Sequence, residues 1–168
     1  LREAIDSILN QTVKTNEFII VKDGPLTEKL DNTIKEYVEE YPGVFKIVTL
    51  KKNMGLAKAL NKGIEQCSNE IIARMDSDDI SMPDRMERQL EAMEANRADI
   101  LSGTIVEFDE SVDKPTAKRE LPEKNEQIIE FAKKRSPFNH PAVMYKKSSV
   151  LKSGLYEDYT YFEDYNLW

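Results

Sequence analysis

Short apolar runs alternate with amphipathic segments along most of this chain, and this alternation limits its possible folds more than any other feature. The apolar runs have the length and residue types of buried strands, at residues 18–21, 45–50, 71–75 and 100–108. Apolar residues at helical spacing fill the segments between them, at residues 1–9, 25–41 and 56–67 and again after residue 83. This pattern predicts a doubly wound α/β sheet.

The second half of the chain gives a weaker pattern. It predicts a helix at residues 128–132, a strand at 142–145 and a helical turn at 148–152. The polar stretch at 109–123 contains Pro115 and Pro122, which favours a long mobile loop. No internal repeat or linker is visible, so we expect one domain over residues 1–168. Helical periodicity starts at Leu1 and no stop signal precedes Trp168, so we expect a chain trimmed at both ends.

Composition narrows the class of protein. The 168 residues are 40% hydrophobic and 33% charged, which is typical of a globular domain long enough to bury a core. The net charge of −7 disfavours binding to nucleic acid through a basic surface. A single cysteine, Cys67, excludes an internal disulfide and fits a reducing compartment. No apolar run has the length of a membrane span.

The strand at residues 71–75 ends in the acidic sequence Asp76-Ser77-Asp78-Asp79. In open α/β sheets, ligands bind just beyond the carboxyl ends of the strands. Carboxylates this close together raise each other's pKa unless a cation neutralises them. A hard divalent cation, which shares oxygen ligands with substrate phosphates, fits such a cluster. The alternative is an Asp-rich solvated turn, since Asp tolerates tight backbone geometry.

Polar residues also follow the two preceding strands. Asp23 comes after the first strand, and Asn53 and Gly55 come after the second, where they lead into the N-terminus of a helix. The backbone N–H groups of such a terminus favour a phosphate or a carboxylate. The pair Glu163-Asp164 lies far downstream among aromatic residues. Polar residues at three successive strand ends predict one ligand site at this edge of the sheet.

Taken in order, these segments resemble the glycosyltransferases of family 2. The matching segments are residues 8–12 (ILNQT), 20–24 (IVKDG), 53–64 (NMGLAKALNKGI), 76–79 (DSDD), 82–85 (MPDR), 139–141 (NHP) and 163–168 (EDYNLW). The resemblance implies a GT-A type nucleotide-diphospho-sugar transferase fold with a Rossmann-like, doubly wound mixed sheet. It divides the chain into a nucleotide-sugar-binding half, 1–80, and an acceptor-side half, 81–168.

The resemblance also assigns roles to individual residues. Asp23 matches the acid that binds the uracil edge of a UDP-sugar, and Asn53 lies in the same donor site. Asp78, supported by Asp76, matches the acid that binds Mg²⁺ or Mn²⁺ at the diphosphate. Asp164 matches the catalytic base that deprotonates the acceptor hydroxyl, with Glu163 the less favoured candidate. The sequence departs from the family pattern at Lys22, where many members carry a second Asp, and it lacks the family's first strand.

The implied activity is inverting transfer of a sugar from a nucleotide-diphosphate sugar, with UDP as the expected nucleotide, to an acceptor hydroxyl. The resemblance implies a glycan or a lipid-linked sugar as acceptor, in surface or capsular polysaccharide assembly. It also implies a cytoplasmic site, at the inner face of a membrane if segments absent here bind one. Two alternatives remain open from the residues. One is a nucleotidyltransferase that makes nucleotide sugars, and the other is a non-catalytic module that binds them.

Simpler structural interpretations apply to the neighbouring residues. We expect Arg74 to hold Asp76 or Asp78 ionised, and Arg85 to have a structural role as a charge on a helix surface. His140 is expected to be a hydrogen-bonded turn histidine, with a donor or acceptor contact as the alternative. Aromatic side chains at Tyr161, Phe162 and Trp168 are expected in the core rather than as surfaces that stack on sugars.

Overall fold

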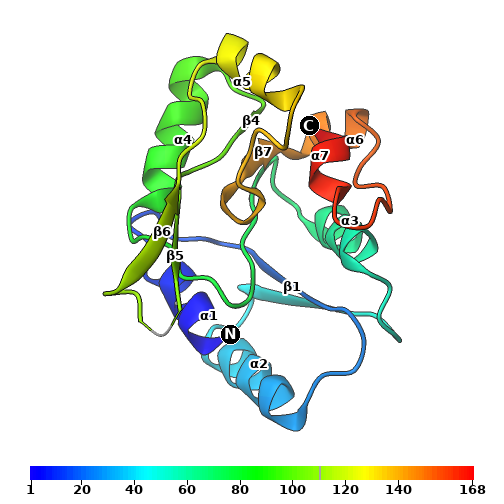
Figure 1. The fold of residues 1–168 in the computed structure, drawn as a ribbon. Helices are drawn as coiled ribbons and strands as arrows, with labels where there is room; N and C mark the ends of the chain where they lie inside the picture. Colours follow the sequence, from blue (N-terminus) through cyan, green and yellow to red (C-terminus); the bar gives the residue numbers. More distant parts are fainter. Residues whose placement is uncertain (110) are drawn as a thin grey trace.

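The computed structural model describes residues 1–109 and 111–168 (Figure 1). In chain order the first half contains α1 (Arg2–Leu9), β1 (Phe18–Lys22), α2 (Glu28–Glu40), β2 (Phe45–Thr49), α3 (Leu56–Gln66), β3 (Ile71–Ala73) and α4 (Arg85–Asn96). The second half contains β4 (Ile100–Leu101), β5 (Ile105–Phe108), β6 (Pro115–Arg119), α5 (Asn125–Ala132), a 3₁₀ turn (His140–Ala142), β7 (Met144–Lys146), α6 (Lys147–Lys152) and α7 (Glu163–Leu167). Among the helices of the described residues, none is long and apolar enough to cross a bilayer.

The strands pair both in parallel and antiparallel. β1 and β2 form a parallel pair in which Phe18 lies opposite Phe45, and the two rings stack with centroids 4.9 Å apart. β7 lies between β3 and β4 and is antiparallel to both. The predicted α/β class is therefore confirmed, with the strands arranged in small separate sheets. Because β1 and β2 are parallel, their carboxyl ends meet at one edge, where Asp23 and Asn53 follow them.

The main core lies where β7 packs against α3 and the C-terminal segments. Its buried members include Ile64 of α3, Val143 and Tyr145 around β7, Tyr156 and Leu167. Val143 and Tyr145 are almost completely shielded from solvent, which explains how an element as short as β7 is held in place. β7 thus packs between β3, which leads into the acidic sequence, and the C-terminal segment that contains Asp164.

Several predicted boundaries were wrong, each for a local reason. α2 begins at Glu28 rather than at residue 25, because the Thr27 hydroxyl accepts a hydrogen bond from the backbone N–H of Leu30 and caps the helix there. The predicted strand at 100–108 is two strands in different sheets. The predicted loop at 109–123 contains β6, which forms a hairpin with β5. Residue 110 of that stretch lies outside the described residues.

Gln11 fixes the segment that follows the acidic sequence against α1. Its side-chain amide donates to the Met82 carbonyl at 2.7 Å, and its side-chain carbonyl accepts from the Met86 backbone N–H at 3.0 Å. The backbone N–H of Ser81 also donates to the Ser7 hydroxyl at 3.0 Å. Since Gln11 is buried, these hydrogen bonds are shielded from water and give the turn at residues 76–82 a rigid support.

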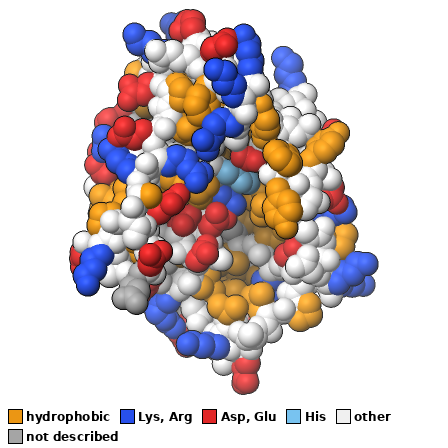
Figure 2. Space-filling view, viewed as in Figure 1, with side chains coloured by type: hydrophobic (Ala, Val, Ile, Leu, Met, Phe, Trp, Pro, Cys, Tyr) orange, Lys and Arg blue, Asp and Glu red, His pale blue; other side chains and the backbone are white. Residues whose placement is uncertain are grey.

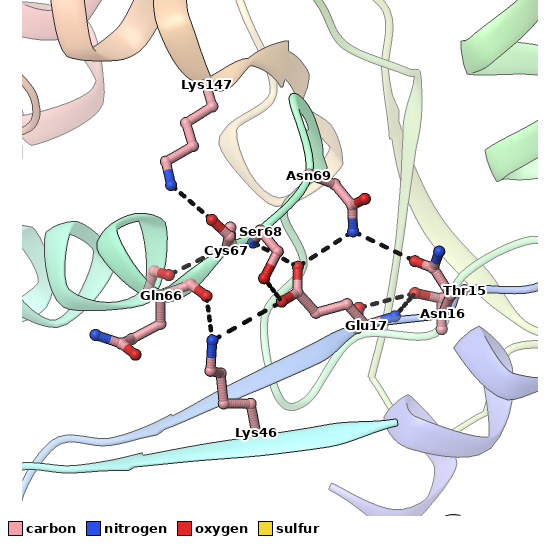
Figure 3. A network of polar contacts seen from close by, with 10 residues as sticks. Thr15, Asn16, Glu17, Lys46, Gln66, Cys67, Ser68, Asn69 and Lys147 are labelled. Carbon is pink, nitrogen blue, oxygen red and sulfur yellow. Dashed lines mark hydrogen bonds and ion pairs between the residues drawn. The ribbon is translucent and has the colours of Figure 1, made fainter. Parts of the chain in front are cut away.

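A second polar network holds the opposite edge of the parallel pair (Figure 3). The Glu17 carboxylate accepts hydrogen bonds from the backbone N–H and the hydroxyl of Ser68, both at 2.8 Å, and from the Asn69 amide. Burial raises the pKa of Glu17. The hydrogen bonds and the charge of Lys46 together lower the pKa by more than burial raises it, so the net pKa lies below its usual value. The network ties the start of β1 to the turn between α3 and β3.

Candidate functional site

Arg74 and Asp76 form the centre of the candidate site. Arg74 follows β3, is only 8% exposed, and donates from both terminal guanidinium nitrogens to the two carboxylate oxygens of Asp76. Such two-pronged pairing fixes the carboxylate in both position and orientation. Arg74 thus pairs with Asp76 and leaves Asp78 exposed on the same turn.

The turn at residues 76–79, here called the acidic turn, carries an excess of negative charge from Asp76, Asp78 and Asp79. Burial raises the pKa of Asp79, and the nearby carboxylates of Asp76 and Asp78 raise it further, against the opposing charges of Arg74 and Arg85. The turn would therefore gain from a bound cation. Across residues 1–109 and 111–168 no three His, Cys, Asp or Glu side chains converge as a complete metal-binding set. One or two carboxylates are nevertheless enough for a hard divalent ion that takes its other ligands from water and substrate phosphates.

Asp23 joins the ends of the two parallel strands. Its carboxylate accepts hydrogen bonds from the backbone N–H groups of Met54 at 2.7 Å and Gly55 at 3.1 Å, just before α3 begins. Gly24 allows this approach, since a Cβ at that position would lie 2.8 Å from the Asn53 backbone nitrogen. The N–H groups before α3 therefore face the Asp23 carboxylate. Asp23 and Asn53 lie together, as predicted from the strand order.

Asp164 lies in the first turn of α7 and accepts a hydrogen bond from the Ser136 hydroxyl at 2.9 Å. His140 lies within electrostatic reach of both Asp164 and Arg74. Burial lowers the pKa of His140 to about 4, helped by the charge of Arg74 and opposed by that of Asp164. The neutral imidazole Nε2 is 3.0 Å from the Tyr156 hydroxyl. His140 is thus a hydrogen-bonded turn histidine, as expected.

The contacts define two groups of predicted site residues. One contains Asp23 and Asn53, and the other contains Asp76, Asp78 and Asp164, related through Arg74 and His140. In the described part of the chain, no side-chain hydrogen bond or ion pair joins the two groups directly. Figure 2 shows acidic side chains gathered beside a hollow near the middle of one face of the molecule.

Three further residues support the site, although the sequence assigned none of them a role: Ser136, Asn139 and Tyr156. Asn139 is buried, and its side-chain amide donates to the carbonyls of Gly103 at 2.9 Å and Arg119 at 3.2 Å. It thereby holds the segment before His140 against the base of the β5–β6 hairpin. The match at residues 139–141 marked this segment, but the partners of Asn139 lie far away in the sequence and gave no signal.

Arg85 is structural, as predicted, but it is partly buried rather than exposed on the helix surface. Its guanidinium donates to the backbone carbonyls of Arg74 at 2.7 Å and Val143 at 3.3 Å, and to the Gln89 side chain at 2.9 Å. Burial and, to a smaller extent, the charge of Arg74 lower the pKa of Arg85 to about 10, against the opposing charge of Asp79. Arg85 therefore anchors α4 to the strand end just before the acidic turn.

Replacing Arg85 with alanine is expected to lower the free energy of unfolding by about 2–4 kcal/mol, because the buried Arg74 carbonyl loses its partner and a cavity remains. Arg88 is the control, since it is one turn along α4, largely exposed, and paired, among the described residues, only with Asp84. Arg88→Ala should change stability by less than about 0.5 kcal/mol. Urea unfolding of both variants measures the difference, and equal stabilities would contradict the anchoring role.

The aromatic residues near Asp164 fall into two classes. Trp168 packs edge-to-face on Phe138 and Tyr156, with centroids 5.8 and 5.9 Å away, so its expected place in the core is confirmed. Tyr161 and Phe162 are 89% and 60% exposed, so the expectation of a core position was wrong for both. Both rings lie in a stretch of residues, 157–162, that is exposed throughout.

Comparison with known proteins identifies the family. The family model described as "Glycosyl transferase family 2" matches residues 1–160. The amylovoran biosynthesis glycosyltransferase AmsE of Erwinia amylovora is 43% identical over all of this chain and 62% of its own length. The Escherichia coli UDP-Gal:alpha-D-GlcNAc-diphosphoundecaprenol beta-1,3-galactosyltransferase is 40% identical over all of this chain and 60% of its length. The chain therefore spans about three fifths of these relatives.

The solved structures support the same fold. The mannosyltransferase PcManGT from Pyrobaculum calidifontis, in complex with GDP-Man and Mn²⁺, superposes with a TM-score of 0.70 at 15% sequence identity. The match covers 98% of this chain and 46% of that structure. The GT-A type fold implied by the sequence is thereby confirmed. On the family match over residues 1–160, the chain belongs to glycosyl transferase family 2.

Proposed function

We propose that this chain carries the donor site and the catalytic base of an inverting, metal-dependent glycosyltransferase. The enzyme would move a sugar from a nucleotide-diphosphate sugar to an acceptor hydroxyl. The main support is the turn after β3, where Arg74 fixes the Asp76 carboxylate and leaves the Asp78 carboxylate exposed beside it.

Asp78 and Asp76 are the residues that would hold a divalent metal ion, either Mg²⁺ or Mn²⁺. The exposed Asp78 carboxylate is free to coordinate directly, whereas Asp76 keeps its orientation through Arg74. When bound, such an ion stabilises the negative charge that develops on a leaving diphosphate. Asp23 and Asn53 would bind the nucleoside at the neighbouring edge, so residues 1–80 would form the donor half and residues 81–168 the acceptor half.

Asp164 would act as the general base. An inverting transfer needs a carboxylate within hydrogen-bond reach of the acceptor hydroxyl, on the side of the sugar opposite the leaving group. Ser136 orients one Asp164 oxygen and leaves the other to accept the proton. His140, with its pKa lowered to about 4, is neutral at physiological pH and adds no positive charge that would weaken this base.

UDP is the proposed nucleotide, and a lipid-linked sugar or a growing glycan the proposed acceptor. Two relatives support both, since one is a UDP-Gal transferase acting on a diphosphoundecaprenol-linked sugar and another is a glycosyltransferase of amylovoran biosynthesis. We therefore propose a role in surface or capsular polysaccharide assembly. The site would work on the cytoplasmic side, at the inner face of a membrane where a lipid-linked acceptor is presented.

The test is nucleotide release from a panel of UDP-, GDP- and TDP-sugars by the full-length protein, in Mn²⁺, in Mg²⁺ and in EDTA. We expect UDP-sugars to be turned over in at least one of the two metals and to be inert in EDTA. Turnover that continues in EDTA would contradict the metal role. A nucleotide sugar bound without turnover would favour the non-catalytic module, and pyrophosphate released from UTP and a sugar phosphate would favour the nucleotidyltransferase. No specific observation favours either alternative.

A further inference from the structure

The segment between α6 and α7 presents a group of exposed aromatic rings. Tyr159, Tyr161 and Phe162 are 52%, 89% and 60% exposed, and we refer to residues 157–162 as the aromatic loop. Large apolar side chains cost free energy when they remain in water, and several on one short loop usually mark a contact surface.

The aromatic loop is held firmly at both ends. At its start, the Asn61 side chain of α3 accepts from the Tyr156 backbone N–H at 3.0 Å and donates to its carbonyl at 2.8 Å. Asp158 forms an ion pair with Lys58 in the first turns of α3. At its end, the Phe162 carbonyl accepts from the Asn166 backbone N–H at 2.9 Å, inside α7. The exposed rings are therefore presented by an anchored loop.

The backbone of the aromatic loop turns its rings outward. Tyr161 has a φ of +70°, in the left-handed region that bulky residues rarely adopt. The Phe162 N–H donates to the Tyr159 carbonyl at 2.7 Å and closes the turn. A left-handed tyrosine persists only where the surrounding contacts enforce it, and such residues cluster at ligand-binding sites.

The position of the loop points to the occupant. It is anchored to α3, whose N-terminus adjoins Asp23 and Asn53, and it leads into α7, which carries Asp164 (Figure 1). Asp164 lies two residues after Phe162. Because the proposed base acts on the acceptor hydroxyl, a ligand that covers the rings beside it belongs to the acceptor.

The charges around the rings narrow the chemistry of that ligand. Glu157, Asp158, Glu163 and Asp164 flank the rings, and only Asp158 has an ion-pair partner among the described residues. This negative surround disfavours an anionic ligand and an anionic membrane surface. An uncharged ring that combines an apolar face with hydroxyl groups can contact the aromatic faces and donate hydrogen bonds to the carboxylates.

We propose that Tyr161 and Phe162 form a platform for a neutral sugar ring of the acceptor, next to Asp164. This inference rests on the proposed function and deepens it, because it names an uncharged pyranose as the group that lies beside the base. The acceptor would then be recognised by ring stacking on the aromatic loop, separately from the nucleotide at the ends of β1, β2 and β3.

The test compares full-length wild type with a Tyr161→Ala, Phe162→Ala double variant on an array of defined neutral oligosaccharides. We expect the wild type to bind at least one of them and the double variant to lose about tenfold in affinity, the loss expected for removing aromatic stacking. Tyr161→Phe keeps the ring and should bind like wild type. Leu151→Ala, an exposed apolar residue on α6, is the control for loss of surface area.

Calorimetric titration with UDP and Mn²⁺ separates this proposal from the proposed function. The double variant should keep wild-type UDP affinity, whereas failure of the wild type to bind UDP would count against the donor site instead. Equal array binding by wild type and double variant, or no array binding by the wild type, would overturn the platform. Loss of binding to phosphatidylcholine vesicles in the double variant would overturn it in favour of a membrane contact, and a ring-dependent change in sedimentation would overturn it in favour of a second copy.

Discussion

Replacing Asp164 with asparagine is expected to lower the rate of sugar transfer by about 10²–10⁴-fold, the usual contribution of general base catalysis. Asparagine keeps the size of the side chain and can still accept the hydrogen bond from Ser136, but it cannot take a proton from the acceptor. UDP affinity should stay close to wild type, because the proposed base acts on the acceptor hydroxyl and not on the nucleotide. Steady-state kinetics together with UDP titration measure both effects.

Glu163 provides the matched control, since it precedes Asp164 in the same turn of α7. Glu163→Gln should retain most of the transfer rate. If Asp164→Asn is fully active and Glu163→Gln is not, the base assignment moves to Glu163. If both variants fail only because they unfold, which far-UV circular dichroism and thermal unfolding would reveal, the carboxylates are structural and the mechanism loses its base.

Replacing Asp78 with asparagine is expected to weaken UDP binding in the presence of Mn²⁺ by about 100-fold or more, because a charged metal ligand is lost. The effect should vanish in EDTA, where wild type and variant should bind UDP equally weakly. This dependence on metal distinguishes a ligand from a residue that merely supports the fold.

Asp84 is the control for removing an acid from the same region. It lies at the start of α4, and its only ion pair is the exposed one with Arg88 at 3.6 Å among the described contacts. Asp84→Asn should leave metal-dependent UDP binding unchanged. Equal UDP affinities for Asp78→Asn and wild type in Mn²⁺ would contradict the metal assignment.

The sequence predicted the parts of the site that depend on local pattern. A buried run that ends in Asp76-Ser77-Asp78 located the acids after a strand, and parallel strand order predicted that Asp23 and Asn53 would lie together. The pairing of Arg74 with one of these acids was expected from their closeness in the sequence. The choice of Asp76 over Asp78 depends on the direction of the turn, which residue types alone do not fix.

The features that the sequence missed depend on contacts between distant segments. The run at residues 100–108 divides because β4 pairs with β7 while β5 pairs with β6. The Asn139 amide nitrogen and the Arg85 guanidinium donate to carbonyls of other segments, so these roles had no local signal. The exposure of Tyr161 and Phe162 was also unpredictable, because aromatic residues are usually buried and a left-handed backbone at tyrosine has no sequence signature.

The proposal that Asp78 holds the metal ion is tested most directly by the position of Mn²⁺ in crystals of the full-length protein grown with UDP. Anomalous scattering at the manganese edge measures this position. We expect a single strong manganese peak within coordination distance of the Asp78 carboxylate and of the UDP diphosphate, with the uracil near Asp23. UDP bound without a manganese peak at Asp78, or a peak coordinated by other residues, would contradict it.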